Sequence, residues 1–478
     1  MAKSQDYSSR TTALPHQREA IEYVKTHRAA ALFDEQGLGK TKIVIEAFAD
    51  LMASHEIDAA LVIAPMTLLF TWEQEVRKHS HLVPVVLRGT RRERKYRLLT
   101  GANFYIVNYD ALVGHVDLFR KLCRSRRFAV ALDESTRIKD PRTETAKAVF
   151  AVAESAQHRV VMTGTPVANK PKDLWAQFYF LDQGELLGDG FDEFAARFDE
   201  RAEDFTGELE HLSELVRSAS IRRVKHDVLE LPDKLFVGHE IDLEGRQLSI
   251  YRQCADDLIV ELGSMDGDTY VREIDNVLEK LLRLVQIASN PGLLDPRYSG
   301  PVAKLEALDG LVHELLQVHE KVIVWSSFVE NVETVARRLR GYGTLIIHGG
   351  VSLDERSRAV IEFQEGESQR VLVANPAAAR EGLTLTRASA AMYLDRSFSL
   401  TDYLQSQDRI HRIGQERVCE IHKLIARGTV DEYVDLVIDL KASIAQHVYR
   451  PGEGSGAEIT RLLADKDEVL RFLGKGPE

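Results

Sequence analysis

The sequence predicts an α/β protein with two parallel sheets, and three observations support this fold class. Short apolar runs alternate with amphipathic stretches from residue 29 to about residue 162. The alternation stops in a middle section of mostly helical pattern, and it resumes at residue 321. Strand–helix alternation of this kind is typical of parallel sheets whose two faces are both covered by helices. We therefore expect two α/β halves around a helical insertion.

Each half is expected to contain several buried strands. In the first half they are residues 29–33, 60–64, 104–107, 128–132 and 159–162, with helices such as 41–53 and 72–79 between them. In the second half they are residues 322–325, 344–347, 370–374, 390–394 and 420–425. The middle section, about 170–294, includes long helices at 251–262 and 270–289 and one strand at 235–243.

Changes in pattern predict the domain boundaries. We expect a flexible N-terminus at 1–12, a first lobe at 13–185, a mainly helical insertion and linker at 186–297, a second lobe at 298–450 and a tail at 451–478. Chain-breaking residues at 290–301 mark the linker, and glycines at 452–456 open the tail before one short helix.

Composition limits the class of protein. The chain has 478 residues, 44% of them hydrophobic and 28% charged, which is ordinary for a globular protein. A net charge of -12 argues against a grip on nucleic acid by the whole surface, although a local basic patch would suffice. Three widely spaced cysteines fit a reducing compartment. Without a long apolar segment or a signal-peptide core, we expect a cytoplasmic protein with no membrane partner.

A glycine-rich loop after the first strand has the composition of a phosphate cradle. It leads into the predicted helix through Gly37, Leu38, Gly39, Lys40 and Thr41. Glycines let backbone amides wrap phosphate oxygens, and a helix N-terminus adds a favourable dipole field. Lys40 would reach the β- and γ-phosphates of ATP, and the Thr41 hydroxyl would hold Mg²⁺. The usual pattern has glycine where this chain has Asp34, so a chance glycine turn is the competing interpretation.

Two adjacent carboxylates, Asp133 and Glu134, follow the apolar run 128–132. Phosphoryl transfer to water needs one carboxylate at the metal ion and another that faces the nucleophile. Asp133 would hold Mg²⁺ and Glu134 would polarise the attacking water. The alternative is a pair of solvated acids at a strand end.

Two threonines follow the strand at 159–162. The hydroxyls of Thr163 and Thr165 would sit near the γ-phosphate and sense its presence, which would couple hydrolysis to movement. Because glycine and proline also occur here, a simple turn is the alternative.

Two arginines in the second half complete the predicted site. Arg409 and Arg412 are three residues apart, so they would share one face of a helical turn. Opposite a bound triphosphate they would stabilise the charge that develops during transfer. Catalysis would then require one half to close on the other, which is the physical basis of a motor. Taken alone, they would be interpreted as a solvated basic helix end.

These motifs together resemble those of the Swi/Snf-type ATPases of helicase superfamily two. Residues 34–41 resemble the first motif of this family, in which aspartate replaces the glycine of other phosphate loops. The resemblance spans residues 14–437. Further matching segments follow in the family's order, at 14–17, 64–73, 107–109, 133–139, 163–169, 222–234, 286–291, 322–328, 348–350, 381–386 and 405–415.

The resemblance implies a fold and a set of roles. The fold would be two RecA-like lobes with a mainly helical Swi/Snf-type insertion between them. Gln17 would contact adenine, Gly382 would lie with the two arginines at the nucleotide, and Gln405 would take part in coupling. The positions expected at DNA are Thr67, Trp72, Asn108, Tyr109, His348 and Arg380.

The resemblance also implies a DNA-dependent ATPase that tracks along double-stranded DNA by its phosphate backbone, without separating the strands. Basic clusters at 88–97 and 120–127 would add charge at DNA or form solvated faces. A strand-separating DNA or RNA helicase and a non-hydrolysing nucleic-acid-binding scaffold are the alternatives. Protein partners in a DNA-processing complex, the biological pathway and the oligomeric state stay open.

This chain departs from the family pattern in the second half. Arg380 and Thr384 stand where glycine and asparagine are common, and Phe398-Ser399-Leu400 replaces a frequent Trp-Asn-Pro. The departures indicate a divergent branch. The compact chain resembles bacterial or phage members of the family more than eukaryotic remodellers.

Overall fold

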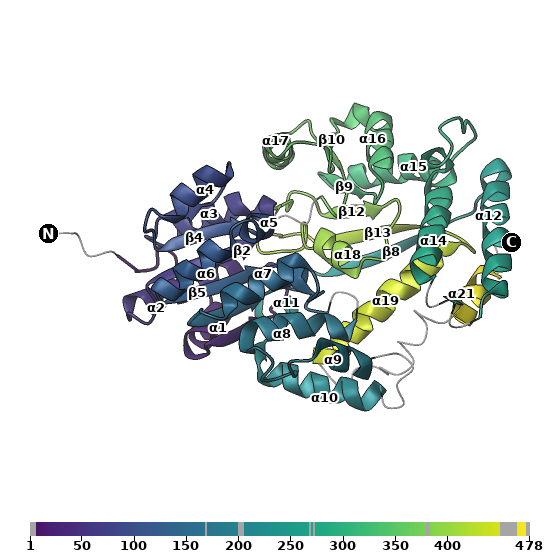
Figure 1. Cartoon of the computed structure of the whole chain (residues 1–478). Helices are drawn as coiled ribbons and strands as arrows, with labels where there is room; N and C mark the ends of the chain where they lie inside the picture. Colours follow the sequence, from purple (N-terminus) through teal and green to yellow (C-terminus); the bar gives the residue numbers. More distant parts are fainter. Residues whose placement is uncertain are drawn as a thin grey trace. The chain divides into compact units, whose positions relative to one another are not determined.

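The computed structural model describes residues 6–167, 170–198, 205–266, 269–270, 273–378, 383–449 and 466–474. The chain divides into two units. Unit 1 comprises residues 1–230 with 445–456, and unit 2 comprises residues 231–444 with 457–478. Each unit has its own sheet with flanking helices (Figure 1).

The sheet of unit 1 has the strand order β3-β4-β2-β5-β6-β1-β7, and all of its pairings are parallel. The five strands that the sequence predicts are confirmed, with ends shifted by a residue or less, and two very short strands join them at the edges. The strands are β1 Ala29–Leu32, β2 Ala59–Ala64, β3 Pro84–Val86, β4 Phe104–Asn108, β5 Phe128–Asp133, β6 His158–Met162 and β7 Ser220–Ile221.

Helices of unit 1 begin where the sequence supplies a start signal. Gly39 ends the phosphate loop and α2 follows it directly, while Thr90 and Glu93 form a reciprocal capping box at α4. The helices are α1 Pro15–Thr26, α2 Lys40–Ala53, α3 Leu69–His79, α4 Arg91–Leu98, α5 Tyr109–Val113, α6 Val116–Ser125, α7 Glu144–Ala153, α8 Trp175–Asp182, α9 Phe191–Arg197, α10 Phe205–Ser218 and α11 Lys225–Val228. Short 3₁₀ turns are η1 Met66–Leu68, η2 Ser135–Ile138 and η3 Pro171–Leu174.

Both faces of this sheet are buried, which explains why its strands are almost entirely apolar. Alternate residues of a strand point to opposite faces. On β1, Ala30 and Leu32 belong to the core formed with α1, α2 and α3. Phe33, just beyond the strand, packs edge-to-face on Phe178 of α8. The carboxyl ends of β1, β5 and β6 therefore lie between two layers of helices.

The sheet of unit 2 has the order β10-β11-β9-β12-β13-β8, again with parallel pairings. Its strands are β8 Lys234–Ile241, β9 Val322–Trp325, β10 Leu345–Ile347, β11 Val371–Ala374, β12 Ala390–Tyr393 and β13 Cys419–Ala426. The strands predicted after residue 321 are confirmed. The strand predicted at 235–243 is also present, but it is the edge strand of this sheet and pairs along its whole length with β13.

The helices of unit 2 cover both faces of the sheet. Val322 and Val324 of β9 belong to a core with α15 and α16, while Ile323 and Trp325 belong to a second core with α17. The helices are α12 Gly245–Ser264, α14 Ile274–Ser289, α15 Ala303–Val318, α16 Val329–Arg338, α17 Leu353–Glu365, α18 Leu400–Gln407, α19 Val430–Tyr449 and α21 Lys466–Leu473, with 3₁₀ turns η4 Pro291–Leu293 and η5 Arg340–Tyr342.

A third core of unit 2 is built by helices. Residues of α12, α14, α19 and α21 pack together in one apolar cluster. The segment predicted as the insertion is thus shared, since α9, α10 and β7 belong to unit 1 and β8, α12 and α14 belong to unit 2. Among the described residues, no helix is both long and apolar enough to cross a membrane.

Candidate active site

The phosphate loop of unit 1 has the backbone shape that its glycines permit. Gly37 and Gly39 both have φ of 85°, in the left-handed region that side chains with a Cβ disfavour. A Cβ on Gly39 would also overlap the Gln17 side-chain amide. Glycine at position 39 is therefore required by its own backbone and by a close neighbour.

Two side chains of α1 hold the middle of this loop. His16 Nε2 lies 3.1 Å from the Leu38 carbonyl oxygen, and Gln17 Nε2 donates to the same oxygen at 3.2 Å. The Gln17 carbonyl oxygen accepts from the Leu14 N–H at 3.0 Å. Gln17 thus ties α1 to the loop, and the adenine contact expected of it stays a prediction.

Lys40 begins α2 and reaches back across the loop. Its ammonium donates to the carbonyl oxygens of Asp34 and Glu35, at 2.6 and 3.2 Å. Burial raises the pKa of Asp133, and the positive charge of Lys40 opposes this rise, so the two groups influence each other electrostatically. Thr41, the next residue of the helix, is half-buried.

Asp133 is the last residue of β5, and only 9% of it is exposed. Its Oδ2 accepts from the Trp72 indole at 2.7 Å, and its Oδ1 accepts from the Glu134 N–H at 3.0 Å. Burial raises the pKa of this carboxyl, while the Trp72 hydrogen bond and the Lys40 charge oppose the shift. The carboxylate is thus oriented at both oxygens in a site that disfavours its charge, and a cation would stabilise it there.

Trp72 and Tyr109, both predicted at DNA, contact Asp133 in this structure. Trp72 is 1% exposed and bonds to the carboxylate, and the Tyr109 hydroxyl donates to the Asp133 carbonyl oxygen at 2.8 Å. Burial, with the Asp133 and Glu134 charges, raises the pKa of Tyr109 well above its ordinary value. Asn108 is buried too. The indole and phenol are therefore parts of the acidic site in this structure, and the DNA contacts expected of Trp72, Asn108 and Tyr109 stay predictions.

Glu134 occupies a strained backbone position. Its φ of 50° lies in the left-handed region, where a residue with a long side chain is uncommon. Such strain persists only where surrounding structure enforces it, and it concentrates at active sites. Here the enforcement comes from β5 on one side and the 3₁₀ turn η2 on the other.

The predicted coupling threonines lie against the phosphate loop. The Thr163 N–H donates to the Leu32 carbonyl oxygen of β1, and the Thr163 hydroxyl accepts from the Thr165 N–H at 3.2 Å. A Cβ on Gly164 would overlap the Gln36 side chain, so this turn touches the loop directly. The Thr165 hydroxyl oxygen is buried and has no hydrogen-bond partner among the described residues. The structure therefore brings Thr163 and Thr165 to the phosphate loop, as expected.

A glutamine that the sequence analysis did not select connects two of these motifs. Gln177 of α8 is fully buried, and its carbonyl oxygen accepts from the Ser135 hydroxyl at 2.7 Å. Its amide donates to the carbonyl oxygens of Pro166 and Asp173, at 2.8 and 3.1 Å. Every polar atom of Gln177 is thus used to bridge the turn after Glu134 and the threonine turn. Only its position in an apolar helix could have indicated it from sequence.

The two arginines of unit 2 are brought together by a shared acceptor. Arg409 Nη1 and Arg412 Nη1 both donate to the Leu383 carbonyl oxygen, at 3.4 and 3.3 Å. Arg409 Nε also donates to the Gln405 carbonyl oxygen at 2.9 Å, and Arg409 is buried. The expected helical turn is wrong, because α18 ends at Gln407 and both arginines follow in turns. Their expected proximity is nevertheless present.

The remaining predicted positions differ in their surroundings. His348 is buried after β10, and its Nδ1 accepts from the Gly350 N–H at 3.2 Å. The Thr67 hydroxyl oxygen is buried and has no hydrogen-bond partner within the described part of the chain, beside an exposed Met66. Arg380 and Gly382 lie outside the described residues. The DNA contacts expected of these residues stay predictions.

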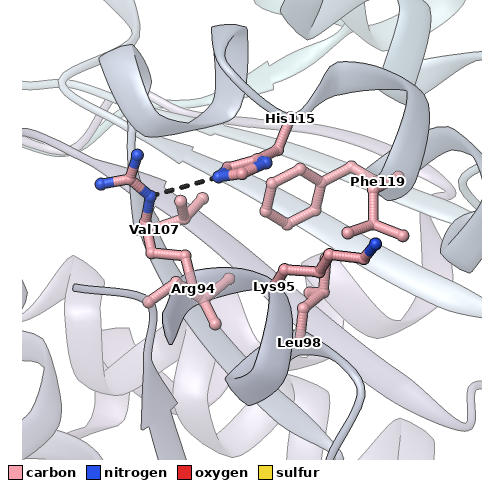
Figure 2. Close-up of a pocket in the computed structure, with 8 residues that line it drawn as sticks. Arg94, Lys95, Leu98, Val107, His115 and Phe119 are labelled. Atoms are coloured by element: carbon pink, nitrogen blue, oxygen red, sulfur yellow. Dashed lines mark hydrogen bonds between the residues drawn. The ribbon is translucent and has the colours of Figure 1, made fainter. Parts of the chain in front are cut away.

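The basic segment 88–97 is partly structural. Arg94 Nη1 donates to the Gly89 carbonyl oxygen, and Arg97 Nη1 donates to that of Val86. Figure 2 shows Arg94 Nε turned toward His115, 3.3 Å away, at a shallow hollow beside Phe119. Burial, with the charge of Arg94, lowers the pKa of His115. The exposed basic residues on α4 are therefore Arg91, Arg92 and Lys95, with the acidic Glu93 exposed among them.

The second basic segment, 120–127, is used within unit 1. Arg127 forms an ion pair with Asp58 at 2.6 Å, and Arg120 forms one with Glu154 at 3.2 Å. Arg126 donates to the carbonyl oxygens of Ala102 and Asp58. These contacts favour a structural role over DNA contact for this segment.

Comparison with known proteins agrees with the site geometry. The model of the SNF2-related domain matches residues 16–293, and that of the helicase conserved C-terminal domain matches residues 303–414. The protein YwqA of Bacillus subtilis, which carries the name of an ATP-dependent helicase/translocase, is 28% identical over 98% of this chain and 51% of its own. The chromatin-remodeling complex ATPase ISW1 of Saccharomyces cerevisiae is 25% identical over 97% of this chain and 43% of its own.

A solved structure, the Sulfolobus solfataricus SWI2/SNF2 ATPase core in complex with dsDNA, covers 99% of this chain and 99% of its own, with 26% identity and a TM-score of 0.46. The chain spans about half the length of the curated relatives that it matches. The SNF2-related model alone matches more than half of the 478 residues. The matched residues include the phosphate loop, the acidic pair and the threonine turn. The chain belongs to the SNF2-related family, with a helicase C-terminal domain following the SNF2-related domain.

Proposed function

We propose that this chain hydrolyses ATP and uses the energy to move along double-stranded DNA without separating its strands. The observation that carries the proposal is the buried Asp133, which accepts hydrogen bonds from Trp72 and Glu134 and lies within the electrostatic influence of Lys40. A carboxylate held in this way beside a glycine loop is what a hydrolytic nucleotide site requires. Family membership and the names of the relatives support the same activity.

The residues of unit 1 fit a magnesium nucleotide. The available ligands are the carboxylate of Asp133 and the hydroxyl of Thr41, and Mg²⁺ prefers such oxygen ligands together with substrate phosphates. When bound, Mg²⁺ supplies charge neutralisation at the β- and γ-phosphates. Lys40 would exchange its carbonyl contacts for phosphate oxygens, and the loop amides from Gly37 to Thr41 would surround the phosphates.

Glu134 would accept the proton of the attacking water. Its strained backbone fixes where the side chain starts, one residue beyond the metal-holding carboxylate. Arg409 and Arg412 would donate to the phosphate oxygens that gain charge during transfer, since guanidinium groups suit this geometry. These arginines belong to unit 2 and the phosphate loop belongs to unit 1, so turnover would depend on both units.

Double-stranded DNA is proposed as the track. The exposed α4 charges Arg91, Arg92 and Lys95 offer sequence-independent contacts to phosphates. Contacts of this kind hold the backbone and read no base, which suits a protein that must move along any sequence.

ATP hydrolysis measured against nucleic acid tests the proposal. We expect turnover to rise by more than about tenfold with double-stranded DNA, and the half-maximal DNA concentration to rise with salt. Single-stranded DNA and RNA should stimulate less at equal nucleotide concentration. Equal or stronger stimulation by single strands would favour strand separation, and no ATP hydrolysis with any nucleic acid would contradict the proposal.

A further inference from the structure

Asp34, the residue that departs from the usual phosphate loop, is completely buried, and Arg223 neutralises it. Arg223 Nη2 lies 2.5 Å from Oδ2, and Nε lies 3.0 Å from Oδ1. The Arg223 backbone N–H donates to the same Oδ1 at 2.9 Å. Two parallel N–H···O contacts fix orientation as well as distance. The carboxylate therefore has its position set by one distant residue.

The same segment of chain holds the next loop residue. The Glu35 N–H donates to the Arg223 carbonyl oxygen at 2.9 Å, and the Lys225 N–H donates to Glu35 Oε2 at 2.7 Å. Residues 220–225, which we name the return segment, begin as β7 and pair in parallel with β1 at Ala31 and Leu32. The return segment is thus an extra edge of the sheet that continues alongside the phosphate loop.

Other contacts hold the loop from its remaining sides. Lys40 donates to the carbonyl oxygens of Asp34 and Glu35. Arg223 also donates to the His16 carbonyl oxygen of α1, and the His16 ring contacts the Leu38 carbonyl oxygen. Arg223 therefore connects the first residue of the loop with the helix that supports its middle.

We propose that Arg223 is a positioning residue of the phosphate loop, and that the return segment sets the conformation in which the loop binds nucleotide phosphates. A buried carboxylate without a partner is strongly unfavourable, so a loop with Asp34 would rearrange if the arginine were lost. The inference rests on the proposed ATP hydrolysis, to which it adds a residue that touches neither substrate nor metal. It also explains how aspartate can replace a glycine here.

A double-mutant cycle on the full chain tests the proposal. The variants are Arg223→Met, Asp34→Asn and the double variant, with Arg223→Lys as a milder change and Arg217→Met, an exposed arginine of α10, as the matched control. Hydrogen exchange of the amides of residues 33–41 reports loop order without nucleotide. Binding of a fluorescent ATP analogue reports the consequence for the site.

Arg223→Met should speed exchange in residues 33–41 and raise the dissociation constant about tenfold. The double variant should be less impaired than Arg223→Met, because it also removes the unpaired carboxylate charge. Arg223→Lys should be intermediate, because a lysine ammonium keeps the charge but cannot contact both oxygens of Asp34 as the guanidinium does. Arg217→Met should match the wild type. If Arg223→Met does not fold, Arg223→Lys and Asp34→Asn carry the same comparison.

Two results would overturn the proposal. One is wild-type exchange and nucleotide affinity in the Arg223 variants, with only a lower melting temperature. The other is additive losses across the cycle. Wild-type protein that binds no ATP would refute the proposed function, while the exchange measurement would still decide whether Arg223 orders the loop.

Discussion

At the scale of single residues, Glu134 is the group whose replacement separates binding from hydrolysis. Glu134→Gln keeps the shape and the strained backbone but removes the base, so ATP turnover should fall by about 100-fold or more. ATP binding should stay within about threefold of wild type, because the phosphates are held elsewhere. Steady-state hydrolysis and nucleotide titration measure the two effects, and wild-type turnover in this variant would refute the role.

Gln177 should contribute both to the stability of unit 1 and to ATP turnover. Gln177→Leu removes both ends of the bridge between Ser135 and Pro166 and leaves buried polar groups unpaired. We expect the free energy of unfolding to fall by about 1–3 kcal/mol and turnover to fall with little change in ATP affinity. Denaturant unfolding and hydrolysis assays measure these quantities.

Ser135→Ala is the control for this bridge, since it removes one contact and leaves the amide of Gln177 bonded to Pro166. It should reduce turnover less than Gln177→Leu. If the two variants unfold at lower denaturant but hydrolyse ATP at the wild-type rate, Gln177 is structural and connects nothing of functional importance.

At the scale of elements, strand β8 contacts its neighbour β13 through a pair of histidines, and protonation of these histidines at low pH should destabilise the fold. His239 Nε2 lies 2.9 Å from His422 Nδ1, and His422 Nε2 lies 3.1 Å from Glu420 Oε2. His319 also contacts Glu420, and the negative charge of Glu314 raises the pKa of His239 and so partly offsets the effect of burial. Burial lowers the pKa of both His239 and His422 below the ordinary 6.5.

Because these folded-state pKa values are lowered, the unfolded chain binds more protons below pH 6.5. The contribution of these two histidines to stability should therefore be fully present above their ordinary pKa of 6.5, and it should be lost as the pH falls below that value. Thermal unfolding from about pH 8 to about pH 5.5 measures the slope, which His422→Gln should reduce. His226→Gln, whose side chain is 99% exposed, should leave it unchanged. An equal slope in all three proteins would contradict the assignment.

Elements with local signals could be predicted from sequence, and elements fixed by distant pairing could not. The phosphate loop could be predicted because glycines stand where the backbone adopts positive φ. Strand β5 could be predicted because five consecutive apolar residues precede Asp133. The strand β8 could be recognised as a strand, but its partner β13 lies far along the chain. β7 has only two residues, and it pairs with β1 next to the ion pair of Arg223 with Asp34, whose partners lie far apart in the chain.

The site residues also fall into two groups, those within a local motif and those whose partners lie far away in the sequence. Lys40, Asp133 and Glu134 lie within local motifs, so residue type and spacing alone predict a role for each of them. The motif position of Trp72 predicts a contact with DNA, and nothing in the local sequence shows that α3 turns the indole toward Asp133. Gln177 has no motif of its own, since its partners Ser135 and Pro166 are brought together only by the fold.

At the scale of the whole molecule, the proposed function assigns the arginines of unit 2 a part in the hydrolysis of ATP bound by unit 1. Arg412→Ala should lower turnover by about 10³-fold while ATP binding stays near the wild-type value. Arg417→Ala is the matched control, because Arg417 is an exposed arginine of the same region that pairs with Glu320. Hydrolysis and nucleotide binding of both variants measure this. Equal activity of the two variants would show that Arg412 takes no part in transfer.

Movement along double-stranded DNA is distinguished from strand separation by measuring displacement of a third strand from a DNA triplex and unwinding of a forked duplex. We expect ATP-dependent release of the third strand by the wild type, no release by Glu134→Gln and no unwinding of the fork. Fork unwinding without triplex release, or triplex release that persists in Glu134→Gln, would contradict it.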